Sequence, residues 1–217
     1  GRVDAPLRNS MAIVKHSQTK IVDTDERQGH RDFAGLVAEL EHETSSARRW
    51  AARDLAEYPE ASPALIDRLK REDDASVREA ILTSLTRLGD QTAVTGLVEC
   101  LRSEDAALRN EVIEAMKELP DEVAPVMGSL LRDADADVRI FAVNILESLR
   151  HPRVEEWLID VIEQDPHVNV CATAVDLLGE VGSSAARHAL EQLTGRFPGE
   201  PYIRFAAELA LKRINED

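Results

Sequence analysis

Three residues in the second half of this sequence carry side chains that bind metals. His167 and Cys171 stand four positions apart and would share one face of a helix, and His151 precedes them in a turn. Imidazole and thiolate groups are ligands of zinc and of haem iron. No fourth ligand is indicated, and a small buried cysteine beside a surface histidine is the commoner arrangement. We therefore expect no metal and no cofactor, and we keep the three residues as ligands in the alternative that the protein binds haem.

No other pattern in the sequence is typical of an active site. It contains no glycine-rich phosphate loop, no Walker lysine, no serine nucleophile motif and no paired-carboxylate signature. Acidic residues are plentiful, but they recur periodically, as helix caps and solvated helix faces would. We therefore expect a protein that is not an enzyme.

Composition narrows the choice of partner and compartment. The 217 residues include 41 Asp and Glu against 26 Lys and Arg, which gives a net charge of −15. This charge opposes binding to nucleic-acid phosphates and to anionic membranes. The two cysteines are far apart and lack a CxxC motif, which suits a reducing compartment, and no segment is apolar enough to cross a bilayer. We expect a cytoplasmic protein whose partner is another protein.

One short motif recurs along the chain: an acid, two variable positions, an apolar residue and usually an arginine. It reads DASVREAI, DAALRNEV and DADVRIFA in three successive copies. Aligned on the apolar residue and the residue after it, six copies lie about 30 residues apart: Ala47-Arg48, Val77-Arg78, Leu108-Arg109, Val138-Arg139, Val168-Asn169 and Ile203-Arg204. A period of this length that holds two helical patterns is the signature of a helical solenoid.

Hydrophobic spacing and capping residues place two helices in each repeat. We predict helix pairs at 33–42/46–58, 63–71/75–88, 91–102/106–118, 122–132/136–149, 153–164/167–181 and 185–194/201–214. Residues 31–217 then form one repeat domain. Residues 1–30 lack helical periodicity, and we expect a disordered arm in which residues 1–10 are an expression remnant and Met11 is the natural start.

The acid and the arginine of the motif have different expected roles. The acid falls near the turn before the second helix, where a carboxylate accepts hydrogen bonds from free N–H groups and opposes the positive end of the helix dipole. The arginine lies in the first turn of that helix, so we expect it to pair sideways with an acid of the neighbouring turn. This predicts a structural ladder of Arg48, Arg78, Arg109, Arg139 and Arg204. Reading phosphate is the alternative role.

The units DDASVREAILTSLTRLGD and DADADVRIFAVNILESLRHP resemble the short HEAT-like repeats of many bacterial proteins, including the phycobilisome lyase group. The resemblance covers about residues 31–217. It implies an all-α, right-handed α-α superhelical solenoid, here of about six HEAT-like helix pairs, whose second helices line a concave surface. Such arrays serve mainly as scaffolds. Lyases of the group hold a linear tetrapyrrole and a phycobiliprotein, although no short motif here identifies such a site.

Positions one and two after each aligned arginine should face outward on the second helices. They supply the expected partner-binding residues: Trp50, Glu79, Asn110, Ile140, Phe141, Val170 and Phe205. The apolar residues of the last three units, together with Cys171, would form an apolar strip. We therefore predict a non-catalytic adaptor or regulatory scaffold that binds a basic protein or an amphipathic helix. The alternative is a ligand-handling protein, either a haem sensor or a phycobilin lyase-like protein, that uses His167, Cys171 and the strip. The oligomeric state stays open.

Overall fold

The computed structural model describes residues 32–216 of the chain. The predicted disordered arm at residues 1–30, with the expected remnant at 1–10 and the start at Met11, lies outside the described residues.

The described residues form six consecutive pairs of α-helices. The first helices are α1 (Phe33–Glu39), α3 (Ser62–Leu69), α5 (Gln91–Cys100), α7 (Pro120–Leu130), α9 (Val154–Gln164) and α11 (Arg187–Arg196). The second helices are α2 (Ser45–Leu55), α4 (Ala75–Leu88), α6 (Ala106–Lys117), α8 (Ala136–Leu146), α10 (Val168–Val181) and α12 (Pro201–Glu216). One turn of 3-10 helix, η1 (Ser184–Ala186), precedes α11. Each helix lies within a few residues of its predicted range, and the described part of the chain contains no strand.

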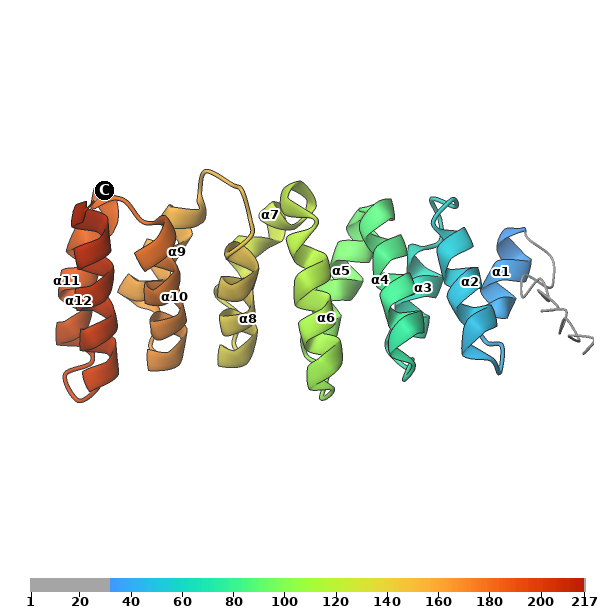
Figure 1. Ribbon diagram of the computed structural model, residues 1–217, viewed down its shortest axis with the longest axis horizontal. Coiled ribbons are helices and arrows are strands. Elements are labelled where there is room, and N and C mark those ends of the chain that lie inside the picture. Colours follow the sequence, from blue (N-terminus) through green and yellow to red (C-terminus); the bar gives the residue numbers. More distant parts are fainter. Residues whose placement is uncertain (1–31, 217) are drawn as a thin grey trace, which may run out of the picture.

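The helix pairs stand in a row, so that each pair, or unit, contacts mainly its neighbours (Figure 1). The second helices pack in the order α2, α4, α6, α8, α10 and α12, and they form one continuous layer. The first helices lie behind that layer, with α3 on α5, α5 on α7 and α9 on α11. This arrangement confirms the predicted all-α solenoid, in which stacking buries the apolar face that a single pair would leave exposed.

Acidic side chains set the starts of several second helices, as the motif indicated. Asp74 accepts hydrogen bonds from the N–H groups of Ser76 and Val77, and Asp105 accepts them in the same way from Ala107 and Leu108. These bonds satisfy N–H groups that have no partner within the helix. At the other end of α4, Gly89 has φ = 58°, a left-handed conformation that glycine adopts without steric cost and that ends the helix.

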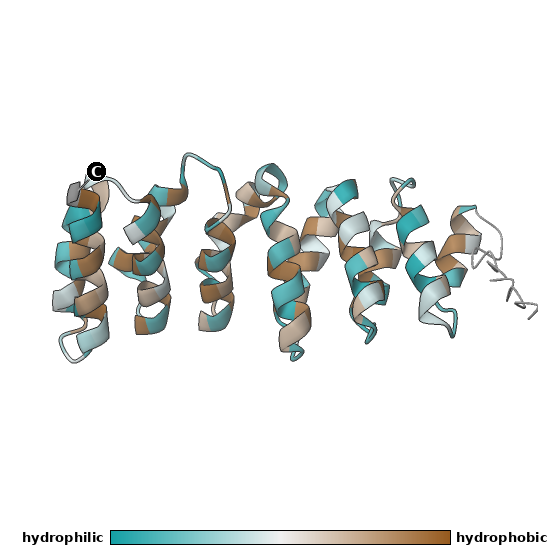
Figure 2. Ribbon diagram, viewed as in Figure 1, coloured by the Kyte–Doolittle hydropathy of each residue, from teal (hydrophilic) through white to brown (hydrophobic). Residues whose placement is uncertain are grey.

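The core is built mainly from leucine, valine, isoleucine and alanine, and Figure 2 shows hydrophobic and hydrophilic residues alternating around the helices. Small residues allow neighbouring units to approach closely. A Cβ atom added at Gly96 would lie 2.4 Å from Cδ1 of Ile66, so α5 packs on α3 through a bare backbone at this point. No helix among the described residues is both long and apolar enough to cross a membrane.

Candidate functional site

Three of the five ladder arginines join adjacent units through ion pairs. Nε of Arg48 lies 2.8 Å from Glu72, and Nε of Arg139 lies 2.6 Å from Asp165 in the next unit. Arg78 pairs with two acids of the next unit, Asp105 at 2.7 Å and Glu111 at 2.9 Å. These guanidinium groups are turned into the interface between units and are largely buried, so they are not presented to a ligand.

The other two ladder arginines form no ion pair with any described residue, and for them the predicted pairing was wrong. Nη1 of Arg109 donates a hydrogen bond of 2.6 Å to the carbonyl of Ser103, and its guanidinium carbon lies 5.6 Å from the centre of the Phe141 ring. Arg204 is exposed on α12, and no acid among the described residues lies within ion-pair distance of it.

The structure also corrects the alignment of the fifth unit by two residues. Nη1 of Arg139 donates to the carbonyl of Asp133, six positions earlier, and Arg109 makes the same bond to Ser103. In the fifth unit Sγ of Cys171 donates to the carbonyl of Asp165, again six positions earlier and 3.4 Å away. Cys171, and not Asn169, therefore occupies the ladder position.

A different arginine replaces the missing one in the fifth unit. Arg196, from α11 of the sixth unit, donates a hydrogen bond of 2.7 Å to the carbonyl of Asp165 and another to the carbonyl of Ile162. Its guanidinium group thus binds the turn that a ladder arginine at position 171 would have bound. The sequence motif did not identify it, because Arg196 ends a first helix and does not begin a second one.

The two-residue shift breaks the predicted apolar strip. Val170 and Cys171 are fully buried, so Val170 cannot contact a partner and its assignment as a binding residue was wrong. Ile140 and Phe141 are half-buried against the core, whereas Phe205 is 63% exposed. The strip is therefore not continuous, and its exposed apolar part is confined to α12.

The three possible metal ligands do not form a site. Cys171 is fully buried, and burial raises the pKa of its thiol to about 11, which disfavours the thiolate that would bind a metal. His167 is exposed at the start of α10, and the ring of His151 stacks on Trp157 with the ring centres 5.0 Å apart. Among residues 32–216 no group of three or more His, Cys, Asp or Glu is placed to hold a metal ion.

A groove on the second-helix layer brings together two of the predicted binding residues. Glu79 of α4 and Asn110 of α6 are both exposed and line a groove of about 600 Å³ between the two helices. The rest of the lining is Ala75, Leu82, Thr83, Thr86, Glu111, Glu114, Ala115 and Glu118. Leu82 and Ala115 are almost fully buried and form an apolar floor, and the glutamates stand around it.

The charge of this groove is strongly one-sided. Four glutamates line it, and none of its described lining residues is a lysine or an arginine. Glu111 is paired with Arg78, but Glu79 and Glu118 form no ion pair with a described residue. A neighbouring hollow of about 250 Å³ between α8 and α10 adds Glu147, Asp176 and Glu180 to the same layer. The second-helix layer therefore presents carboxylates above a thin apolar floor from α4 to α10.

Trp50, the predicted binding residue of the first unit, lies in a different environment. It is half-buried on α2, with the guanidinium carbons of Arg53 and Arg49 5.3 and 5.8 Å from its ring. These distances are typical of cation–π contacts. The second-helix layer is thus basic and aromatic at α2 and acidic from α4 to α10.

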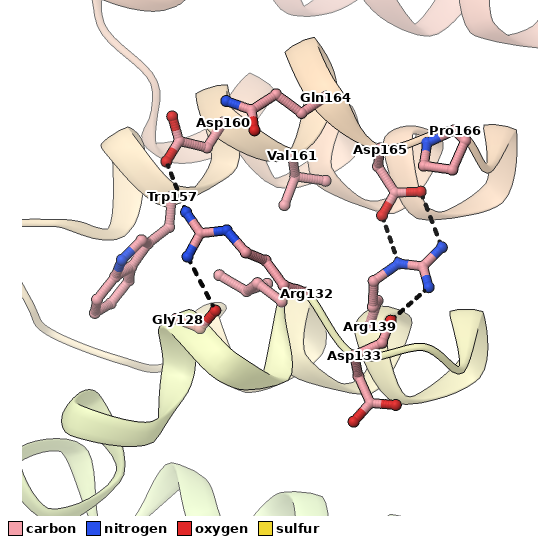
Figure 3. A pocket seen from close by; sticks show the side chains of 11 residues that line it. Gly128, Arg132, Asp133, Arg139, Trp157, Asp160, Val161, Gln164, Asp165 and Pro166 are labelled. Atoms are coloured by element: carbon pink, nitrogen blue, oxygen red, sulfur yellow. Dashed lines mark hydrogen bonds and ion pairs between the residues drawn. The ribbon is translucent and has the colours of Figure 1, made fainter.

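A second hollow, of about 280 Å³, lies between α7 and α9 on the first-helix side (Figure 3). Its charged groups are already paired. Arg139 binds Asp165, Arg132 lies 3.9 Å from Asp160 and 3.3 Å from the carbonyl of Gly128, and Asp133 pairs with Arg102 outside the hollow. Because these pairs already neutralise the charges of the hollow, we regard the acidic groove as the stronger candidate site.

Most groove residues were missed by the motif alignment, which followed only two positions of each second helix. Glu111, Glu114 and Glu118 are spaced by three and four residues on α6, and this spacing puts them on one helix face. The sequence therefore contained the signal.

A family model for HEAT repeats matches residues 33–117 and 123–212, and the chain belongs to the HEAT-repeat family. Among curated proteins, the chain is 33% identical over 174 residues to the bilin biosynthesis protein PecE of Nostoc sp. strain PCC 7120, covering 78% of this chain and 65% of that protein. It is 42% identical over 122 residues to PecE of Mastigocladus laminosus, covering 54% of this chain and 45% of that protein. The chain therefore spans about two thirds and about half the length of these relatives.

Among solved structures, the archaeal HEAT-like repeat protein of Thermococcus onnurineus NA1 aligns with 83% of this chain and 86% of its own, at 15% identity and a TM-score of 0.46.

Proposed function

We propose that this protein is a non-catalytic, protein-binding scaffold that holds a basic segment of its partner on the second-helix layer. The observation that carries the proposal is the acidic groove between α4 and α6, with four glutamates around a floor of Leu82 and Ala115. Glu79 and Asn110, expected from the sequence to bind a partner, line this groove.

The groove has the chemistry to bind lysine and arginine side chains. Such side chains place their methylene groups on an apolar surface while the charged end stays near water or an anion. The floor here is narrow, and the exposed carboxylates of Glu79, Glu114 and Glu118 stand beside it. The net charge of −15 would in addition speed encounter with a basic partner and make binding sensitive to salt.

A defined probe tests the proposal. A fluorescent amphipathic helical peptide, with lysine and arginine on one face and leucine on the other, is titrated with the protein at low and at high salt. We expect binding that weakens with salt, and about tenfold weaker binding for the double variant Glu79→Gln with Glu114→Gln.

The matched control carries the same two neutralisations on the first helices, Glu163→Gln with Glu191→Gln, both at exposed positions. It loses the same net charge but leaves the groove intact. If both double variants lose affinity equally, the binding is diffuse electrostatic attraction and the groove is not the site. A peptide in which glutamate replaces every lysine and arginine should not bind.

A second candidate function, the handling of a linear tetrapyrrole as in a phycobilin lyase, is favoured by the similarity to the two PecE proteins. The test is a titration with biliverdin that follows its visible absorbance and the fluorescence of Trp50 and Trp157. Saturable spectral change with quenching would support this function. Unchanged spectra, together with peptide binding, would leave the scaffold function alone.

A further inference from the structure

The four glutamates of the groove between α4 and α6 are not equivalent. Glu111 lies 2.9 Å from Nε of Arg78, and Glu114 lies 3.0 Å from Nζ of Lys117. The other two, Glu79 on α4 and Glu118 at the end of α6, are exposed and form no ion pair with any described residue. Each of the two helices therefore brings one carboxylate to the groove whose charge no described side chain balances.

The two unpaired carboxylates stand at opposite ends of the groove. The helices α4 and α6 are second helices of consecutive units and pack side by side, and Arg78 and Arg109 are equivalent positions on them. Glu79 is one residue past Arg78, whereas Glu118 is nine residues past Arg109. Because an α-helix rises 1.5 Å per residue, this difference of eight residues corresponds to about 12 Å along the helices.

The apolar floor lies midway between these two ends. Leu82 is four residues past Arg78. Ala115 is six residues past Arg109, so the centre of the floor is about five residues past the ladder position. Along the groove the order is thus carboxylate, apolar floor and carboxylate, with about 6 Å between successive features.

Cations at the same two levels of the layer do not neutralise these carboxylates. Arg49 of α2 is at the level of Glu79 but forms no ion pair with it. Arg87 of α4 is at the level of Glu118, and its guanidinium group instead lies 2.6 Å from Glu57 of the first unit. A basic side chain of a partner would therefore meet an unpaired carboxylate at either end of the groove.

We propose that the groove recognises one helix of its partner that carries a basic, an apolar and a second basic residue at positions i, i+4 and i+8. The pattern rests on the proposed function and specifies the partner segment. The three positions share one face of a helix and follow each other at about 6 Å, which matches the order along the groove. The partner helix lies along the groove, with its apolar residue on Leu82 and Ala115 and its basic residues beside Glu79 and Glu118.

A helix fits this groove better than an extended chain does. An extended segment could present a basic, apolar and basic series at alternate positions with a similar reach. Its backbone N–H and C=O groups would then lie over the floor of Leu82 and Ala115, where the described residues offer no strand edge to pair with them. A helix satisfies these groups internally.

The first test compares two alanine-rich helical peptides of about 18 residues that have the same composition, charge and face. One carries Lys, Leu and Lys at i, i+4 and i+8, and the other carries Lys, Lys and Leu there. We expect the first to bind about fivefold more tightly by fluorescence anisotropy, because the second puts a lysine over the floor. Equal affinities overturn the pattern, whereas the proposed function stands if Glu79→Gln with Glu114→Gln still weakens both peptides.

A third peptide tests the helical conformation. It carries Lys-Pro-Leu-Pro-Lys, in which the prolines prevent a helix and the extended chain gives the same order of side chains. We expect weaker binding than for the helical Lys, Leu, Lys peptide. Tighter binding overturns the assignment of a helix as the occupant.

Single variants test the two ends of the groove. Glu79→Gln and Glu118→Gln should each weaken binding of the Lys, Leu, Lys peptide about three- to fivefold, as for exposed ion pairs. The matched control Glu163→Gln, on a first helix, removes the same charge and should leave the affinity unchanged. If either groove variant behaves like the control, that end of the groove does not bind a basic residue and the pattern is wrong.

A charge exchange then ties each lysine to one end. Glu118→Lys should weaken binding of the Lys, Leu, Lys peptide further than Glu118→Gln does. Replacing one peptide lysine by glutamate should restore the affinity when it is the lysine that faces position 118, and not when it is the other. Far-UV circular dichroism checks that the variant keeps its fold. If neither exchanged peptide regains affinity for the folded variant, the proposed pairing is overturned.

Discussion

The first four units and the last two are joined by different chemistry, although their helices are arranged alike. In the first four units an arginine from the start of a second helix reaches across to an acid of the following unit, as Arg48 does to Glu72 and Arg139 to Asp165, with Arg109 as the exception. In the fifth unit the buried thiol of Cys171 stands in that place, and Arg196 binds the turn from the following first helix. The turn at Asp165 is thus bound from the fourth unit by an ion pair to its carboxylate, and from the sixth unit by hydrogen bonds to carbonyl groups.

This difference teaches that the turn between the helices must be bound, but not by one particular residue. The carbonyl groups of the turn have no partners within the helices and need donors. A guanidinium group supplies several donors in a fixed plane and can reach the turn from either helix of a neighbouring unit. The units with an ion pair should therefore be the more sensitive ones to the loss of their arginine and to acid.

The largest effect is expected for Arg139→Ala. The substitution leaves the carboxylate of Asp165, which is only 6% exposed, without its charged partner. Removal of one member of a buried ion pair costs about 3–5 kcal/mol. Urea unfolding followed by circular dichroism should show this loss in the free energy of unfolding.

A second variant separates the lost charge pair from lost packing. Arg139→Met combined with Asp165→Leu removes both charges and keeps apolar volume, and it should recover more than half of the stability lost by Arg139→Ala. If the double variant is less stable than Arg139→Ala, the ion pair itself, and not the isolated carboxylate, controls stability.

Acid should lower the stability of the first units by somewhat less than Arg139→Ala lowers that of the whole fold. Burial alone would raise the pKa of Glu72, but hydrogen bonds from Arg48, from the N–H of Asp74 and from Arg68 outweigh it and lower the pKa to about 2 from an ordinary value of 4.5. The carboxylate thus stabilises the folded state fully above about pH 4.5, and this contribution is lost as the pH falls toward 2. The difference in pKa corresponds to about 3 kcal/mol.

Hydrogen exchange at several pH values would locate that acid-labile region. Below about pH 4, within the window that the lowered pKa of Glu72 defines, the amides of α2 and α4 should lose protection before those of α10 and α12. The Glu72→Gln variant should be less stable at neutral pH and should lack this pH-dependent step. Equal loss of protection at both ends of the array would contradict the assignment to Glu72.

Arg196→Ala should have a smaller effect than Arg139→Ala. Arg196 donates to the carbonyls of Asp165 and Ile162 but pairs with no carboxylate among the described residues, so its loss leaves neutral groups unsatisfied. We expect a cost of about 2 kcal/mol. The measurement is the same urea unfolding experiment, and a cost equal to that of Arg139→Ala would show that the ion pair adds nothing to the bond with the turn.

The sequence predicted the fold well because its signals are local and repeated. Helix ranges follow from hydrophobic spacing, from acids such as Asp74 and Asp105 that cap helices, and from Gly89. Six imperfect copies of one pattern indicate stacking, since a lone helix pair cannot bury its apolar face. The prediction failed where it assumed that all copies align without gaps. The fifth unit is offset by two residues, so Val170, expected at the surface, lies in the core.

The groove was predicted only in part, for a physical reason. The spacing of its glutamates indicated one face of α6. That they line one groove with Glu79 depends on how α4 and α6 pack, and the sequence motif does not encode the distance between these two helices. Arg196 was missed because its contact joins residues of different helix types. Interactions within one helix follow from spacing, whereas those between units require the packing itself.

The smallest effect is expected at Arg109, a ladder arginine that forms no ion pair with a described residue. It lies in an arginine-bearing unit, yet it donates only to the carbonyl of Ser103 and stacks on Phe141. Arg109→Ala should therefore cost about 1 kcal/mol, the combined value of one hydrogen bond and a partly exposed cation–π contact. Phe141→Leu keeps an apolar contact but removes the ring, and it should make the further loss from Arg109→Ala smaller than in the parent. A double-mutant cycle on unfolding free energies measures this coupling; if Arg109→Ala costs as much as Arg139→Ala, the ladder does not owe its strength to the carboxylates.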